Sequence, residues 1–167
     1  MIFDTESLHL RPPCSSDALL LFRFLGDAQA MRFTQAHPSL DHTDRYLEAH
    51  ELNRQRVGYA PWTILEKSSR TIVGFGGLYE DPFDPGWGLE VGYYFAPSAW
   101  GKGYATELVR FSLALLRQDR ALSVVRAFAH PENTASRRVL LKAGFTEERF
   151  IPFMNRHLYR ADLSGSP

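Results

Sequence analysis

Hydrophobic residues alternate with polar ones in several short stretches of the chain and recur at helical spacing in others. The alternation of Leu8-His9-Leu10-Arg11, closed by two prolines, predicts a first strand. Further strand-like runs are predicted at residues 59–66, 71–79, 89–96, 122–129, 145–150 and 154–163. N-capping residues at 15–17 predict a helix that runs to residue 25, with a continuation over 27–33 after a break. Asp41 or Thr43 can cap a second helix that runs to about residue 54, and helical spacing predicts further helices at 105–116 and 133–143.

The order of these elements indicates an α+β fold (mixed α/β). Early strands joined by short polar connections, such as residues 67–70, favour antiparallel pairing. The later strand–helix–strand order favours a parallel crossover. We therefore expect a single domain over residues 1–167, ending in a tail at residues 164–167. Its core is expected to be a central twisted mixed sheet of roughly six to seven strands, with about four helices distributed over both faces.

Composition narrows the class of protein. The 19 basic and 19 acidic residues cancel, whereas nucleic-acid binders carry a basic excess or stripe. No apolar run reaches the ~18–20 residues that span a bilayer, and residues 1–6 do not resemble a signal peptide. Cys14 is the only cysteine, which suits a reducing compartment. We expect a soluble cytoplasmic protein with no nucleic-acid or membrane partner; its histidines form no ligand cluster, so no metal is expected either.

The most informative stretch runs from Leu89 to Glu107. It reads as a buried strand, a turn at Pro97, a glycine loop (Trp100–Gly103) and the first turn of a helix. A helix N-terminus offers unpaired backbone N–H groups and the positive end of the helix dipole, and glycine lets an anion approach the backbone. The stretch is therefore a candidate phosphate-binding site. An ordinary turn would carry the same two glycines.

These residues resemble the GNAT superfamily of acetyl-CoA-dependent N-acyltransferases, and more closely its RimJ/RimL-like branch. The family's phosphate loop has the form Q/R-x-x-G-x-G/A, and residues 100–105, Trp-Gly-Lys-Gly-Tyr-Ala, match it at both small-residue positions. Trp100 departs from the first position, where the RimJ/RimL-like branch often has tryptophan. The segment from Asn133 to Ser136 and the later Gly144-Phe145 also resemble a family motif, as does the first strand. The similarity spans about residues 7–162.

The resemblance implies that acetyl-CoA binds between the strands at 89–96 and 122–129, which would splay around its pantetheine arm. A bulge near Tyr93–Phe95 would free backbone groups to pair with that arm, and the loop amides would hold the pyrophosphate. Asn133 would reach the pantetheine or an ordered water. The implied cofactor-binding residues are Tyr94, Phe95, Ala96, Trp100, Gly101, Lys102, Gly103, Tyr104, Ala105, Thr106 and Asn133.

Acyl transfer to an amine requires a base, stabilisation of the thioester oxygen and a proton for the leaving thiolate. Glu90 occupies the family's carboxylate position and is the candidate base, although it could equally pair with a neighbouring strand. The tyrosine that acts as acid in many members is replaced by Leu140. Ser136 fits the serine that RimL-like enzymes are thought to use, or it caps the helix.

The acceptor is expected to be a primary amine, either a small molecule or a protein N-terminus. Trp62, Tyr79 and Phe83 are candidate substrate-binding residues, but aromatic residues at these positions could equally belong to the core. The acidic loop at residues 80–88 could attract the amine or be a solvated loop. A homodimer is compatible with this picture. The alternatives are a non-catalytic acyl-CoA-binding module and, less favoured, a dinucleotide binder, which lacks the full G-x-G-x-x-G.

Overall fold

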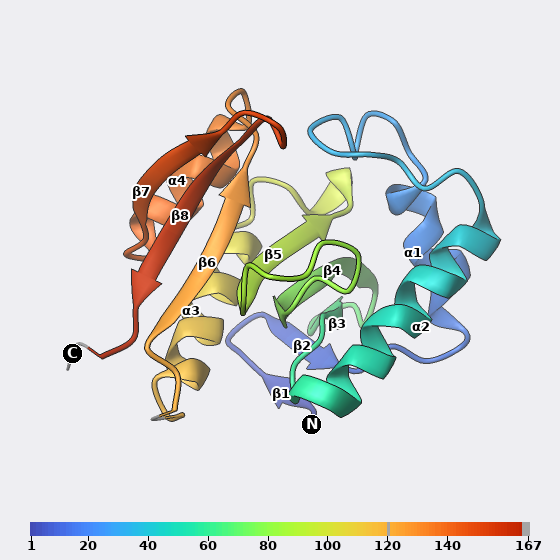
Figure 1. Ribbon diagram of the computed structural model, residues 1–167. Coiled ribbons are helices and arrows are strands. Elements are labelled where there is room, and N and C mark those ends of the chain that lie inside the picture. Colours follow the sequence, from blue (N-terminus) through green and yellow to red (C-terminus); the bar gives the residue numbers. More distant parts are fainter. Residues whose placement is uncertain (120, 165–167) are drawn as a thin grey trace.

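The computed structural model describes residues 1–119 and 121–164. These residues form an eight-stranded sheet with the order β1-β2-β3-β4-β5-β6-β8-β7 (Figure 1). The strands are β1 (Phe3–Asp4), β2 (Leu8–Arg11), β3 (Trp62–Glu66), β4 (Ile72–Tyr79), β5 (Glu90–Phe95), β6 (Val124–Ala129), β7 (Thr146–Ile151) and β8 (Arg156–Asp162). Among these strands, β5 and β6 pair in parallel and all the other neighbours are antiparallel.

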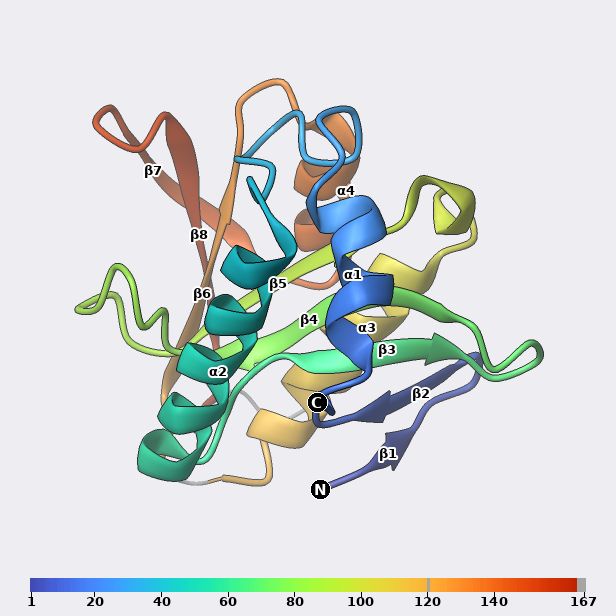
Figure 2. The ribbon, with the colours of Figure 1, turned by 90° about the vertical axis from the view of Figure 1, so that its right-hand side faces the viewer.

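Four α-helices cover the sheet in the described part of the chain, two on each face (Figures 1 and 2). They are α1 (Asp17–Leu25), α2 (Leu40–Val57), α3 (Tyr104–Leu116) and α4 (Thr134–Lys142), and a 3-10 turn, η1 (Pro97–Ala99), precedes α3. On one face, α1 and α2 pack on Phe75 of β4 with a cluster that includes Leu21, Leu25 and Leu47. On the other face, α3 and α4 bury a larger cluster.

The expected mixed α+β fold is confirmed, and the helices lie on both faces as predicted. The sheet has one strand more than the predicted upper count because β1, only two residues long, is too short to show a hydrophobic pattern. The expected continuation of the first helix over residues 27–33 is wrong, since these residues form turns. Ser39, rather than Asp41 or Thr43, caps α2 by accepting a hydrogen bond from the His42 amide. Of the expected tail, residues 165–167 lie outside the described residues.

Candidate active site

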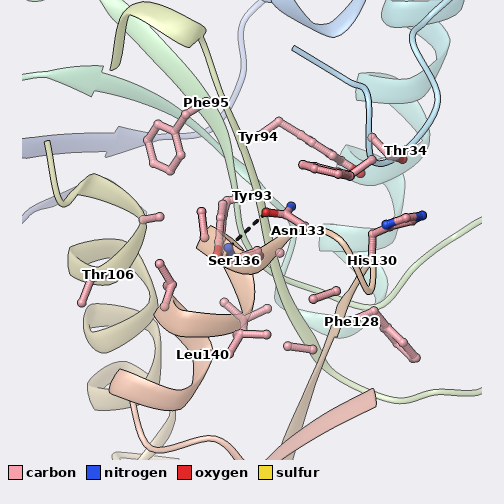
Figure 3. A pocket seen from close by; sticks show the side chains of 18 of the residues that line it. Thr34, Tyr93, Tyr94, Phe95, Thr106, Phe128, His130, Asn133, Ser136 and Leu140 are labelled. Carbon is pink, nitrogen blue, oxygen red and sulfur yellow. Dashed lines mark hydrogen bonds between the residues drawn. The ribbon is translucent and has the colours of Figure 1, made fainter. Parts of the chain in front are cut away.

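The sheet opens between β5 and β6. The two strands share a single paired position, Glu90 with Arg126, where the Arg126 amide donates to the Leu89 carbonyl at 3.0 Å. Beyond this point the strands diverge, and a cavity of about 650 Å³ occupies the space. Its walls come from β5, the glycine loop, the end of β6, α4 and the loop between α1 and α2 (Figure 3). Glu90 therefore lies at the base of the β5–β6 gap.

Strand β5 keeps regular pairing with β4 along its other edge. The register runs from Glu90 opposite Tyr79 to Phe95 opposite Gly74 without a shift, so the expected bulge near Tyr93–Phe95 is wrong. Backbone groups of β5 face the gap without a bulge. Because the Ala96 amide bonds to Val73 on the β4 side, alternation turns the amides of Tyr93 and Phe95 toward the gap. An extended ligand in the gap could pair with them as a further strand would.

Alternation also divides the β5 side chains between the two faces of the sheet. Tyr94 packs with the α1–α2 cluster, and Glu90 lies on the same side because its parity is the same. Val91, Tyr93 and Phe95 pack with the α3–α4 cluster. The strand thus presents a carboxyl group to one face of the gap and a tyrosine hydroxyl to the other.

The glycine loop leads directly into α3. Gly101 and Gly103 have φ angles of +75° and +83°, in the left-handed region that side chains disfavour. Gly103 is the N-cap of α3, and no side chain in the described residues caps this helix. The amides of its first turn therefore keep their hydrogen-bonding capacity for a ligand, as a phosphate site requires.

Side chains of the loop tie it to the sheet. The Trp100 indole N–H donates to the Phe95 carbonyl at 2.9 Å. The Lys102 ammonium pairs with Glu66 of β3 at 3.0 Å, and the Tyr104 hydroxyl also donates to Glu66. Hydrogen bonds from Tyr104, then Ser69 and Lys102, lower the pKa of Glu66 to about 2. These anchors fix the loop while its backbone amides stay available.

The structure brings most of the expected cofactor residues to one place. The cavity is lined by Tyr94, Phe95, Trp100, Gly101, Gly103, Tyr104, Ala105, Thr106 and Asn133. Ala96 and Lys102 do not line it. Ala96 instead pairs with β4, and Lys102 is directed to Glu66.

Glu90 is buried, with 6% of its surface exposed, and lines the cavity. Burial raises the pKa of Glu90 to about 8, Asp81 and Asp84 add to the rise, and Arg126 opposes it. A carboxyl group with this pKa gains and loses a proton near neutral pH, which is the property of a general base or acid.

Ser136 lies across the gap on the first turn of α4. The Asn133 side chain caps this helix by accepting a hydrogen bond from the Ser136 amide at 3.1 Å. The Ser136 hydroxyl is 2.9 Å from the Tyr93 hydroxyl of β5, and both residues line the cavity (Figure 3). Asn133 is therefore the cap, and the serine hydroxyl faces the strand. Tyr93 was missed as a site residue, although alternation from Glu90 places it on the face opposite the carboxyl group.

The three expected acceptor residues lie in different environments. Tyr79 lines the main cavity. Phe83 stacks on Tyr46 and lines a separate cavity of about 270 Å³. Trp62 is only 3% exposed and packs against Phe3 and Phe111 in the α3–α4 cluster, so the structure does not bring it to the site.

Several residues that line the cavity were not anticipated from the sequence. Phe33 and Thr34, from the loop between α1 and α2, line the main cavity, as does Arg156 at the start of β8. The Arg156 guanidinium donates to the Phe33 carbonyl at 2.7 Å and so ties this loop to the opposite side of the gap. The wrongly expected helix over residues 27–33 hid this loop.

Two features are absent from the described residues: a metal-binding cluster and a membrane-spanning helix. Residues 1–119 and 121–164 hold no group of three or more His, Cys, Asp or Glu side chains that could bind a metal ion. In the same ranges, no helix is both long and apolar enough to cross a membrane.

Comparison with known proteins points to one family. Residues 7–146 match the sequence profile described as acetyltransferase (GNAT) domain. The Bacillus subtilis (strain 168) protein YkkB is 27% identical over 153 residues, which cover 91% of this chain and 89% of YkkB.

Two solved structures share the fold at low sequence identity. One is RimL, a ribosomal L7/L12 alpha-N-protein acetyltransferase in complex with coenzyme A: 18% identity, TM-score 0.80, covering 97% of this chain and 98% of RimL. The other is spermidine N-acetyltransferase from Vibrio cholerae in complex with CoA and spermine: 18% identity, TM-score 0.75, covering 95% and 96%.

Proposed function

The chain belongs to the GNAT acetyltransferase family, and on this basis we propose that it transfers an acetyl group from acetyl-CoA to a primary amine by direct attack in a ternary complex. It is an acyltransferase enzyme, like the related N-acetyltransferases. The observation that carries the proposal is the β5–β6 gap, with a buried carboxyl group of raised pKa at its base and an uncapped helix N-terminus at its edge.

The cofactor half of the proposal rests on backbone groups. The pyrophosphate of acetyl-CoA accepts hydrogen bonds from the amides between Gly101 and Ala105, at the positive end of α3. The pantetheine arm enters the gap and pairs with the amides of β5 that face it. The N–H of Phe95 is the candidate donor to the thioester oxygen. Asn133 keeps its side-chain N–H₂ for the arm, because its oxygen caps α4.

The chemistry uses the two faces of the gap. Glu90 takes a proton from the acceptor ammonium, directly or through water, and the free amine attacks the thioester carbonyl. A bond forms between nitrogen and carbon, the carbon–sulfur bond breaks, and its electron pair goes to sulfur. The nitrogen releases its second proton to water as the amide forms. The Ser136 hydroxyl, on the opposite face, donates to that sulfur. The base for the attacking amine and the hydrogen-bond donor for the leaving sulfur therefore lie on opposite faces of the gap.

The acceptor end of the cavity carries both acidic and basic side chains. Asp81 and Glu90 line it with Tyr79, and the cationic side chains of Arg32 and Arg156 line it as well. The solved relatives are named as acting on a ribosomal protein N-terminus and on spermidine. We propose that the acceptor here carries a primary amine, either on a small molecule or on a protein N-terminus. The single, exposed Cys14 is consistent with a reducing compartment such as the cytoplasm.

The test is to incubate the protein with acetyl-CoA and each member of an acceptor panel, and to measure the release of the free CoA thiol. The panel contains amino acids, polyamines, amino sugars and peptides with free or blocked N-termini. We expect CoA release that depends on one class of amine and an acetylated product in equal amount. Tight binding of acetyl-CoA without release over the whole panel would instead support the alternative, a non-catalytic acyl-CoA-binding module.

A further inference from the structure

The hydroxyl groups of Tyr93 and Ser136 form an isolated pair inside the cavity. They are 2.9 Å apart and come from β5 and α4, which are 43 residues apart in sequence. Within residues 1–119 and 121–164, neither hydroxyl makes another hydrogen bond. Two hydroxyls that share one hydrogen bond leave one hydrogen free for a ligand. The direction of the shared bond decides which hydroxyl can donate to the ligand.

We propose that Tyr93 is a positioning residue for acyl transfer: it donates to the Ser136 oxygen and thereby directs the Ser136 hydrogen toward the sulfur of the leaving CoA. This inference rests on the proposed function. It adds Tyr93 to the proposed mechanism and specifies that the tyrosine donates to the serine.

The chemistry of the two groups favours this direction. A phenol is a stronger hydrogen-bond donor than an aliphatic alcohol, because its O–H is the more acidic. Burial raises the pKa of Tyr93 to about 12, against an opposing effect of its bond to Ser136, so the phenol keeps its hydrogen at physiological pH. A serine hydroxyl can rotate freely. A bond from Tyr93 restricts that rotation, and hydrogen bonds in such a chain strengthen one another.

The sheet is built to hold Tyr93 in this place. Gly76 of β4 lies directly opposite Tyr93, and a Cβ atom at Gly76 would come within 2.7 Å of the Tyr93 Cβ and 2.5 Å of its Cα. The Tyr93 ring also contacts the Phe95 ring, with centroids 5.9 Å apart. A side chain at position 76 would therefore displace the tyrosine backbone. Gly76 lets Tyr93 lie close to the sheet and within reach of α4.

The role requires no net loss of a proton by either hydroxyl. As the carbon–sulfur bond breaks, negative charge develops on sulfur, and the Ser136 O–H stabilises it as a hydrogen-bond donor. The amine nitrogen releases two protons, the first to Glu90 and the second to water. Since thiols have pKa values near 8.5, the released CoA can take its proton from water.

The test compares Tyr93→Phe, Ser136→Ala and the double variant, with Tyr59→Phe as the matched control. Tyr59→Phe removes the same hydroxyl oxygen. The Tyr59 hydroxyl contacts Asp119, and neither residue lines the cavity. We expect Tyr93→Phe to lower kcat by about 5- to 100-fold, the range of one hydrogen bond acting in the transition state. The KM for acetyl-CoA and the melting temperature should change little. The double variant should be no slower than Ser136→Ala, because Tyr93 acts through the serine.

Two results would overturn the inference while leaving a role for the serine. One is a normal kcat for Tyr93→Phe together with a slow Ser136→Ala, which would leave the serine's proposed role standing without the tyrosine. The other is a multiplicative loss in the double variant, which would mean that the two hydroxyls act independently. A Ser136→Ala enzyme with normal turnover would remove both residues from the mechanism, while CoA release by the unaltered chain would still support the proposed function.

Discussion

The two ends of the cavity are built in different ways. The proposed cofactor end comes mainly from one continuous segment, residues 90–106, which supplies the strand, the loop and the first turn of α3; the end of β6 and α4 complete it across the gap. The acceptor end is assembled from the α1–α2 loop, the end of β4, the start of β5 and the start of β8. Backbone amides dominate at the first end, and side chains dominate at the second.

This difference has a functional consequence. A donor held by backbone groups can be bound by many different sequences, provided that glycines keep the left-handed loop. An acceptor held by side chains from separate segments can change without disturbing the donor. We therefore expect substitutions at one end to alter KM for one substrate only, and substitutions at the gap between them to alter kcat.

The largest effect is expected at the base of the gap. Glu90→Gln should lower kcat/KM by about 100-fold or more, because the base is lost. In the unaltered enzyme, kcat/KM should rise with pH up to an inflection near 8, where Glu90 loses its proton. An acceptor amine with a pKa well above this range stays an ammonium and adds no inflection near 8. The pH–rate profile of the variant should lack the inflection.

The matched control for this variant is Glu48→Gln, which makes the same change at an exposed position of α2. Its profile should equal that of the unaltered enzyme. An inflection near 8 that survives in Glu90→Gln would assign the titration to another group.

The next effect is expected in the glycine loop. Gly103→Val should raise KM for acetyl-CoA by about tenfold or more, because a β-branched residue at a φ of +83° costs about 1–2 kcal/mol and moves the loop amides. The kcat at saturating acetyl-CoA should be retained. Gly144→Val, at a φ of +97° beyond the end of α4, imposes a similar strain away from the loop. Equal losses of acetyl-CoA affinity in the two variants would show that general destabilisation, not the loop, is responsible.

A third effect concerns His50, which lies behind the acceptor end against Tyr46 and Tyr79. Burial lowers the pKa of His50 to about 4, with a further contribution from Arg54. Neither ring nitrogen has a hydrogen-bond partner in the described residues. A depressed pKa contributes stability that is present above pH ~6.5 and is lost as the pH falls toward 4.

Urea unfolding at pH 7 and pH 5 measures this contribution. The free energy of unfolding falls between pH 7 and pH 5, and we expect this fall to be about 1–2 kcal/mol smaller in His50→Phe than in the unaltered protein. Burial also lowers the pKa of His37 to about 4, so His37 continues to contribute to the pH dependence of stability in this variant. Leu52→Phe, which places a phenyl ring at an exposed position of the same helix and leaves every histidine in place, is the control. An unchanged pH dependence in His50→Phe would mean that the ring is solvated in the native state.

The smallest effect is expected at Arg156. Arg156→Gln removes the bond to the Phe33 carbonyl and loosens the acceptor loop. We expect KM for the acceptor to rise about three- to fivefold, the effect of one hydrogen bond, with KM for acetyl-CoA unchanged. Arg160→Gln, on the same strand and paired with Asp162, is the control. A rise in KM for acetyl-CoA instead would mean that the two ends are not independent.

The same difference explains what the sequence could predict. The glycine loop and its helix are contiguous, so local chemistry alone identified Gly101, Gly103 and the uncapped helix start. The acceptor end depends on which distant segments meet, and single-sequence patterns do not encode that. Trp62 illustrates the limit: in a strand buried on both faces, alternation could not decide which face the tryptophan occupies.

Tyr93 shows a second limit. Strand alternation places it opposite Glu90, but its pairing with Ser136 depends on how closely α4 approaches β5. The parallel pairing of β5 with β6 was expected, whereas its restriction to the single position at Glu90 was not. The family resemblance implied that the two strands diverge, and the structure shows that they diverge beyond Glu90.

The most direct test of the central claim is a crystal structure of this chain with bound CoA. We expect the pyrophosphate on the amides of residues 101–105, the pantetheine arm between β5 and β6, and the sulfur within hydrogen-bonding distance of the Ser136 hydroxyl, with Glu90 across the gap. A CoA molecule whose pantetheine arm lies outside the β5–β6 gap would contradict the claim.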